Sequence, residues 1–363
     1  MKDEKSCGTN SAAQVEGKKP YSENNKTAEQ HANAATAKAV QPFKRSKLVT
    51  AVAVVVSIVV ALCAFLMVWY LGDNYPDFKR FRQSFAIPGL EEGLIPQGVA
   101  NYNDTFYVSG YMNDGSPARI YVIEDGVATG YVTVKLSDGR DYTGHASGIA
   151  TNGSKFWMVS DSTVYVLSRT DIMSAAKNGG SVKVNSSWNA NCSASFCYYT
   201  NNSLYVGEFY RSGKYETDET HHFTTPAGDE NKALILRYSA TSSNPYPTRA
   251  YSIPGNIQGM AFNSDSSKLI LSQSYALPNS KILVYDEDSA KSKTGILKVG
   301  EYNVTVYYID SSILEQTYSI PCMSEGLCSD GNRVYVLFES ASAKYKPFVR
   351  EQLKNTYYFT VRG

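Results

Sequence analysis

The segments SIPGNIQGMAF (252–262) and SIPCMSEGLCS (319–329) share one pattern: Ser-Ile-Pro, a short loop, a polar residue, Gly and an apolar run. Three further copies of the second half of this pattern begin near Ile95, His145 and Ser193. In each copy a short apolar stretch is followed by a turn rich in Asn, Asp, Gly and Ser and then by an alternating stretch. This order is typical of a β-hairpin, so the chain repeats one hairpin five times.

The spacing of the repeats indicates the architecture. We align Gln97, Ser147, Phe196, Gln258 and Glu325, which lie 50, 49, 62 and 67 residues apart. Propeller blades of about 40 to 50 residues fit this period once loop insertions are allowed. A third alternating segment follows every hairpin, and a fourth follows four of them, as GYVTVKL, SVKVN, TRAYSIP and QTYSIP. A short helix is also expected at TDIMSAAKN, within residues 170–178.

The predicted fold is therefore all-β, a five-bladed β-propeller. The last copy lacks a fourth segment, and RQSFAIPG at 82–89 repeats the Ile-Pro of AYSIPG and TYSIPC. We expect this N-terminal strand to complete the last blade, which would remove the open edges of the sheet. A two-sheet sandwich is the alternative, since short strands with turn signals also describe it.

Three segments precede the propeller, which is assigned to 82–363. Residues 1–47 contain few large aliphatic side chains and are expected to be a disordered cytoplasmic tail. Residues 48–71 carry no charge, and a helix of this length, about 36 Å, can span a hydrocarbon core of about 30 Å. The sequence thus predicts a transmembrane helix at 48–71 and a linker at 72–81.

Charges flanking the apolar segment predict its orientation. The tail holds nine Lys and Arg against five Asp and Glu, whereas Asp73 and Asp77 are the first charges after the segment. The positive-inside rule then places the N-terminus in the cytoplasm and the propeller outside the cell membrane. A cleaved signal peptide is the alternative, but the polar region before the apolar run is too long for one. We predict an uncleaved single-pass signal-anchor.

Four cysteines fall in the exported part, and an even number in an oxidising compartment predicts two disulfides. The candidates are Cys192, Cys197, Cys322 and Cys328. Their connectivity is open, with 192–197 and 322–328 preferred. Neither spacing fits a zinc knuckle, and His is scarce.

The openings QGMAF, SGIA and SEGL resemble the inner strands of calcium-binding propeller hydrolases of the gluconolactonase type and of phytase-like propellers. MSEGLCSDGNRVYVLFES is also similar to exported bacterial propellers of unassigned function. The resemblance covers residues 82–363 at the level of the fold. It implies a propeller but brings no catalytic set with it.

Ligands of propellers usually bind near the central channel. Because the first two strands of a blade are antiparallel, the start of the inner strand and the end of the second strand lie on one face. The candidate ligand-binding residues at these positions are Gln97, His145, Ser147, Asp161, Glu208, Gln258, Gln273, Glu325 and Glu339. Tyr111 and Phe196 fall at equivalent positions, and the face is expected to be polar, acidic and rich in amides.

Several chemistries fit the candidate residues of this face. Glu208, Glu325 and Glu339 could hold Ca²⁺, which takes six to eight oxygen ligands, or the carboxylates could cap strands and pair with cations. Two carboxylates could instead serve as acid and base in glycoside hydrolysis, and His145 could act as a general base or as a hydrogen-bonded channel residue. The insertion at 211–232, with His221 and His222, is either a recognition loop or a solvated charged loop.

The sequence favours a membrane-anchored propeller that binds an extracellular glycan, an envelope component or a protein partner through this face. A calcium-dependent hydrolase that uses the same face is the alternative, and no catalytic residues are assigned. A nucleic acid is not an expected partner, because the formal charge is +1 and no basic stripe is evident.

Overall fold

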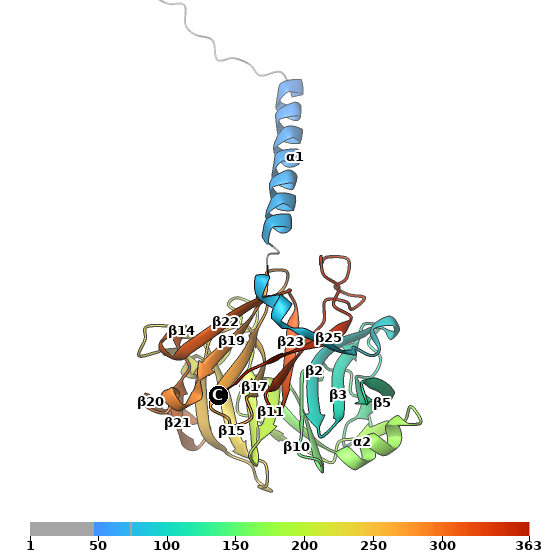
Figure 1. Cartoon of the computed structure of the whole chain (residues 1–363), viewed down its shortest axis with the longest axis vertical. Helices are drawn as coiled ribbons and strands as arrows, with labels where there is room; N and C mark the ends of the chain where they lie inside the picture. The colour runs from blue at the N-terminus through green and yellow to red at the C-terminus, as the bar shows by residue number, and fades with distance from the viewer. Residues whose placement is uncertain (1–46, 73–74, 363) are drawn as a thin grey trace, which may run out of the picture. The chain divides into compact units, whose positions relative to one another are not determined.

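The structure, a computed structural model, describes residues 47–72 and 75–362. The tail predicted to be disordered lies outside the described residues except for Lys47. The first described element is the helix α1 (Lys47–Gly72), labelled in Figure 1. Its span Lys47–Val68 is long and apolar enough to cross a membrane, and none of it is buried within the protein. By length and composition α1 is therefore a candidate single-pass membrane helix and is unlike the core helix of a soluble protein.

The β unit consists of five sheets with at least four strands each, which confirms the five-bladed propeller. Blade 1 contains β2 (Leu94–Tyr102), β3 (Thr105–Met112), β4 (Arg119–Glu124) and β5 (Val127–Lys135). Blade 2 contains β6 (Gly148–Thr151), β7 (Lys155–Ser160), β8 (Thr163–Ser168) and β10 (Ser186–Asn189). Blade 3 contains β11 (Ala194–Thr200), β12 (Ser203–Glu208), β15 (Ala233–Ser239) and β16 (Pro247–Ile253).

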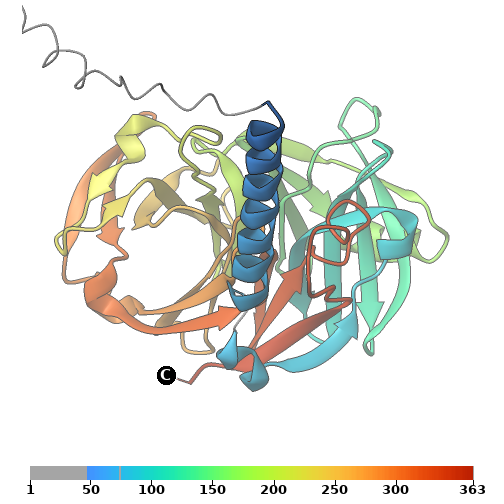
Figure 2. The same cartoon turned by 90° about the horizontal axis from the view of Figure 1, so that it is seen from above.

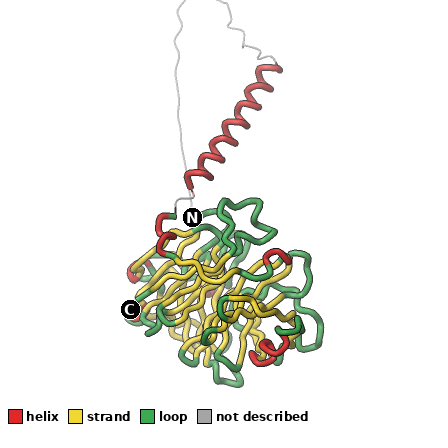
Figure 3. The backbone as a smooth tube through the Cα atoms, turned by 45° about the vertical axis from the view of Figure 1, so that its right-hand side comes forward, coloured by secondary structure: helices red, strands yellow, loops and turns green. Residues whose placement is uncertain are grey.

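Blade 4 contains β17 (Ile257–Phe262), β18 (Lys268–Gln273), β19 (Ser280–Asp286) and β22 (Leu314–Ile320). Blade 5 contains β23 (Ser324–Asp330), β24 (Arg333–Phe338), β25 (Asn355–Thr360) and β1 (Arg82–Ala86). The inner strands contact one another in a closed circle, β2–β6–β11–β17–β23–β2. Figure 2 shows the resulting ring of sheets, and Figure 3 shows that strands and loops make up most of this unit.

The last blade is closed by the first strand. β1 pairs antiparallel with β25, with Arg82 opposite Tyr358 and Gln83 opposite Tyr357. Thr356 Oγ1 also donates a hydrogen bond of 3.1 Å to the carbonyl oxygen of Phe85. The strand predicted at 82–89 therefore completes blade 5, as the repeated Ile-Pro indicated.

The fourth strand of blade 2 differs from the prediction. The segment SVKVN forms β9 (Ser181–Lys183), which pairs in parallel with β5 and so extends blade 1. The next segment, β10, pairs antiparallel with β8 and supplies the fourth strand of blade 2. The alternating pattern of SVKVN indicated a strand correctly, but a pattern along one strand does not specify its partner.

Several insertions lie between consecutive strands of the blades. The connection before β22 forms the hairpin β20 (Thr294–Val299) and β21 (Tyr302–Tyr308), and β21 pairs in parallel with β16 of blade 3. The insertion in blade 3 carries the small hairpin β13 (Phe223–Thr224) and β14 (Glu230–Asn231). The expected helix at 170–178 is present as α2 (Arg169–Ala176). Short helical turns are α3 (Glu287–Ala290), η1 (Pro76–Arg80), η2 (Leu90–Glu92), η3 (Glu219–His221) and η4 (Ser311–Ile313).

In four of the five repeats a glycine follows the polar residue and brings neighbouring blades together. A Cβ atom at Gly148 would lie 2.5 Å from Phe196 Cα and 2.6 Å from Cys197 N on the inner strand of the next blade. A Cβ atom at Gly326 would likewise lie 3.0 Å from Val99 N of blade 1. Only glycine permits this approach of two backbones, which explains why a polar residue followed by Gly recurs.

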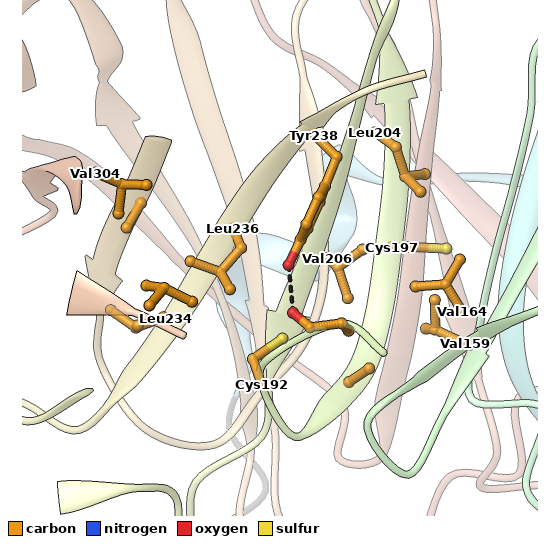
Figure 4. Packing of buried hydrophobic residues seen from close by; sticks show 14 of the residues in the cluster. Val159, Val164, Cys192, Cys197, Leu204, Val206, Leu234, Leu236, Tyr238 and Val304 are labelled. Carbon is orange, nitrogen blue, oxygen red and sulfur yellow. Dashed lines mark hydrogen bonds between the residues drawn. The ribbon is translucent and has the colours of Figure 1, made fainter. Parts of the chain in front are cut away.

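No disulfide is formed among the cysteines of the described residues, contrary to the prediction. Cys322 and Cys328 pack in different hydrophobic clusters rather than against each other. Cys192 and Cys197 share a cluster between blades 2 and 3 but lie apart within it (Figure 4). All four cysteines are buried and pack as small apolar side chains.

Candidate functional site

We call the end of the propeller where inner strands begin and second strands end the polar face. In four of the five inner strands the register with the second strand shifts at the position of the repeated polar residue. Gln97, Gln258 and Glu325 therefore occupy β-bulges, which redirect side chains and are frequent beside functional sites. In blade 3 the bulge falls at Ser195, so the alignment of Phe196 with this position was wrong by one residue. Phe196 is instead a core side chain, 2% exposed.

Glu325 and Glu339 form the centre of the polar face in blade 5. Gln258 Nε2 donates a hydrogen bond of 3.1 Å to Glu325 Oε1, and Gln97 Nε2 donates one of 3.0 Å to Glu339 Oε2. The two carboxyl groups also interact directly through a hydrogen bond. Four of the predicted residues, drawn from blades 1, 4 and 5, thus converge.

These carboxyls are enclosed, with exposed fractions of only 4% for Glu325 and 9% for Glu339. Burial, then the negative charge of Glu339, raises the pKa of Glu325 well above its ordinary value. Burial also raises the pKa of Glu339, to about 7, although the hydrogen bond from Glu325, the charge of Lys344 and the hydrogen bond from Gln97 lower it. Burial and the charge of Glu339 thus favour the protonated form of Glu325, while the pKa of Glu339 lies near neutrality.

Stability should depend on pH through this pair. Both pKa values are higher in the folded protein than in the unfolded chain, so the folded protein binds more protons between about pH 4.5 and 7. The free energy of unfolding should consequently fall as the pH rises from about 5 to 8. The variant Glu325→Gln keeps a hydrogen-bond donor for Glu339 but has no titrating proton at this position. Between pH 5 and 8 its free energy of unfolding should therefore fall less than that of the unchanged protein. Urea unfolding at pH 5, 6, 7 and 8 measures both. The exposed Glu301→Gln should behave as the unchanged protein does, and an identical slope for all three proteins would refute this role of the pair.

A second group of side chains adjoins the carboxyl pair. Lys344 Nζ donates a hydrogen bond of 2.6 Å to the hydroxyl of Tyr111, and the Tyr111 ring lies 4.8 Å from the ring of His145. Burial raises the pKa of Tyr345, and the negative charge of Glu339 and a hydrogen bond with Tyr111 raise it further. Lys344 and Tyr345 belong to the loop 339–354, so this loop covers the carboxyl pair. His145 is exposed on this face.

Glu208 is not part of this cluster. Its carboxylate accepts hydrogen bonds from Ser193 N at 3.0 Å and Leu234 N at 2.9 Å, and His221 Nδ1 lies 3.0 Å from Oε1. Glu208 and His221 are 1% and 6% exposed. This buried contact fastens the insertion of blade 3 to the sheet, so the insertion is anchored at His221 rather than simply solvated.

The three carboxylates proposed as a calcium site, Glu208, Glu325 and Glu339, are therefore not brought together. Within the described ranges no group of three or more His, Cys, Asp and Glu side chains is arranged to hold a metal ion. Ser147 and Asp161 also stand apart from the carboxyl pair. Ser147 forms a backbone hydrogen bond to Val159, and Asp161 accepts a hydrogen bond of 3.0 Å from Ser160 Oγ.

An open pocket of about 390 Å³ lies on the polar face between blades 3 and 4. Gln273, one of the predicted residues, lines it and donates a hydrogen bond of 2.9 Å to the carbonyl of Gly255. Sequence reasoning missed the other polar residues of its wall, among them Arg211, Asn256 and Lys281. Arg211 opens the insertion and Lys281 pairs with Gln273 across the strands, so position in the repeat was the available signal. On the polar face Glu208, Glu325 and Glu339 are buried, whereas Asp161, Arg211 and Lys281 are exposed.

Comparisons with known proteins add little beyond the fold. No family model matches the chain, and no curated protein matches it. Among solved structures it is similar to the glutaminyl cyclase of Myxococcus xanthus, with 8% identity and a TM-score of 0.39 over 78% of this chain and 96% of that one. It is also similar to the WD40 propeller of Doa1, with 6% identity and a TM-score of 0.37 over 78% and 97% of the two chains. It is similar as well to the WD40 repeats of RRP9, with 9% identity and a TM-score of 0.37 over 80% of this chain and 99% of that one. The chain has a propeller fold, and the resemblance to the gluconolactonase type is not established at the level of a family.

Proposed function

We propose that the chain is a single-pass membrane protein whose propeller lies outside the cell and binds a glycan, an envelope component or a protein through its polar face. The observation that carries this proposal is the open pocket beside Gln273, on the face that the repeat predicted. Its walls are strand ends and short loops of two blades, which hold polar groups in fixed positions. The excess of Lys and Arg before α1 supports a cytoplasmic N-terminus.

The test is a binding panel with the full chain in detergent. Immobilised neutral, carboxylated and sulfated glycans and extracellular proteins are offered to the protein and to Lys281→Trp, which places an indole at the pocket. We expect retention on at least one class and its loss in Lys281→Trp. Lys298→Trp, on the outer edge of the six-stranded sheet, is the matched control and should bind normally. Retention that Lys281→Trp leaves unchanged would remove the pocket from the function.

Hydrolysis at the same face is the second candidate, and one observation favours it. The pKa of Glu325 is raised well above its ordinary value and that of Glu339 lies near 7, an asymmetry that suits a general acid beside a general base. The calcium-dependent form of this hypothesis has less support, because Glu208 is engaged by His221. Loop 339–354 would have to move aside for a substrate to reach either carboxyl.

Lactone, aryl ester and aryl glycoside substrates, with and without EDTA, test this candidate. A hydrolase of this type loses turnover in both Glu325→Gln and Glu339→Gln while the variants stay folded. If EDTA abolishes turnover, the hydrolase requires a divalent cation, and the calcium-dependent form of the hypothesis is supported. Turnover that persists in both variants would rule out the carboxyl pair as its source.

A further inference from the structure

The pocket between blades 3 and 4 has an unusual balance of charge. Its lining contains two cations, Arg211 and Lys281, and no carboxylate. Both side chains are exposed, and neither forms an ion pair within the described part of the chain. Lys214 lies beside them, with its Nζ 6.0 Å from the centre of the Tyr275 ring. An anion entering the pocket would therefore meet cations that no protein carboxylate neutralises.

Arg211 is held in place before any ligand arrives. Its guanidinium carbon lies 4.4 Å from the centre of the Tyr275 ring, which is a cation–π contact. A guanidinium stacked in this way keeps its N–H groups in its own plane available for a bidentate contact with a planar anion. Because the side chain is already oriented, less conformational entropy is lost on binding.

The pocket wall also holds one acceptor that lacks a donor. Asn256 Oδ1 is buried from solvent and has no hydrogen-bond partner in the described residues. The backbone of this residue is fixed by two hydrogen bonds, from Asn256 N to Tyr210 O and from Ser274 N to Asn256 O, each 2.9 Å. A buried acceptor without a partner is costly, and a ligand hydroxyl would satisfy it once the Asn256 side chain turns its amide oxygen into the pocket.

The pocket wall is strained at Ala276, which adopts φ of +56°, a left-handed conformation that alanine rarely takes. Strain of this kind persists where the surrounding structure imposes it, and it concentrates at ligand sites. The volume of about 390 Å³ lies within the range of small-ligand pockets and admits a sugar ring.

Resting on the proposed binding function, we infer that this pocket binds an acidic saccharide. Arg211 and Lys281 contact its carboxylate or sulfate group, Asn256 Oδ1 accepts a hydrogen bond from a sugar hydroxyl, and the aromatic edge of Tyr275 borders the ring. An acidic peptide carries the charge but lacks hydroxyl groups spaced around a rigid ring, so it satisfies the arrangement less completely.

The experiment titrates the full chain in detergent by calorimetry with oligogalacturonate, with its methyl ester and with a sulfated disaccharide. We expect the oligogalacturonate or the sulfated sugar to bind and the uncharged ester to bind at least tenfold more weakly. The double variant Arg211→Gln, Lys281→Gln should weaken binding of the acidic sugar at least tenfold. Asn256 has φ of +61°, a left-handed conformation that Asp also tolerates, so Asn256→Asp adds a negative charge at the acceptor and should weaken binding similarly. Lys298→Gln removes one exposed positive charge outside the pocket; it is the control and should bind as the unchanged protein does.

The outcomes separate this inference from the function on which it rests. Equal affinity for the acid and its ester, no binding of either acidic sugar at millimolar concentration, or an unaffected double variant each overturns the inference. Equal binding of a polyglutamate peptide overturns it in favour of an acidic protein partner. If a neutral glycan is retained in the panel and lost in Lys281→Trp, the binding function stands and the acidic class is wrong.

Discussion

Replacing Phe85 with Ala should lower the free energy of unfolding by about 3 to 5 kcal/mol, the usual cost of emptying a phenylalanine site in a core. Phe85 is the buried residue of β1 and is 4% exposed. Its ring packs at 5.0 Å from the ring of Phe106 in blade 1, within the cluster between blades 5 and 1. The side chain therefore joins the closing strand to the neighbouring blade, and its removal weakens the closure of the ring.

Thermal unfolding measures this effect. For a domain of this size about 1 kcal/mol corresponds to roughly 2 °C, so a fall of about 6 to 10 °C is expected. Arg82→Ala, at an exposed position of the same strand, is the control and should change the melting temperature by about 1 °C or less. Equal melting temperatures for Phe85→Ala and Arg82→Ala would mean that β1 does not hold the ring closed.

Gly148→Ala should be nearly as damaging although it adds a single methyl group. The new Cβ would meet three backbone atoms of Phe196 and Cys197 at 2.5, 2.6 and 2.8 Å. Backbone atoms of an inner strand cannot rotate away as a side chain can, so blades 2 and 3 must separate. Overpacking of this kind costs about 1 to 3 kcal/mol, and the rigid contact places this variant at the upper end.

The neighbouring variant Ser147→Ala provides the comparison, because it removes an atom and adds none. The Ser147 hydroxyl forms no side-chain hydrogen bond in the described part of the chain, so a change under about 1 kcal/mol is expected. Urea unfolding of the two variants measures both values on one scale. If Gly148→Ala were as stable as Ser147→Ala, the inner strands would have more freedom than their distances indicate.

Much of the fold could be predicted because the repeat reports local structure. Each polar residue followed by Gly marks a place where inner strands touch, and this constraint is visible in the sequence. Blade 3 has Phe196 where Gly is expected, and the missing Gly misplaced the alignment by one residue. The sequence also could not predict that β10, and not β9, supplies the fourth strand of blade 2. Both segments can form strands, and tertiary packing decides which sheet each joins.

The candidate site was predicted less completely than the fold. The repeat placed Gln97, Gln258 and Glu325 at equivalent strand starts, and in the structure these three residues lie at register shifts between the first and second strands. The burial of Glu325 and Glu339 depends on loop 339–354, whose length and path the repeat does not specify. The engagement of Glu208 by His221 likewise depends on an insertion that is peculiar to blade 3.

Closing blade 5 with β1 has a consequence for synthesis of the chain. Phe85 and Thr356, which join β1 to β25, lie 271 positions apart. The first strand of the propeller therefore cannot pair until the last strand has been synthesised. At about 5 to 20 residues per second the ribosome needs roughly 15 to 50 s to cover that interval. Throughout this time β1 has an unpaired edge, and such edges pair readily with other chains. A nascent chain of this protein therefore spends most of its synthesis as an open arc, and chaperones that cover strand edges should matter more for its yield than for its final stability.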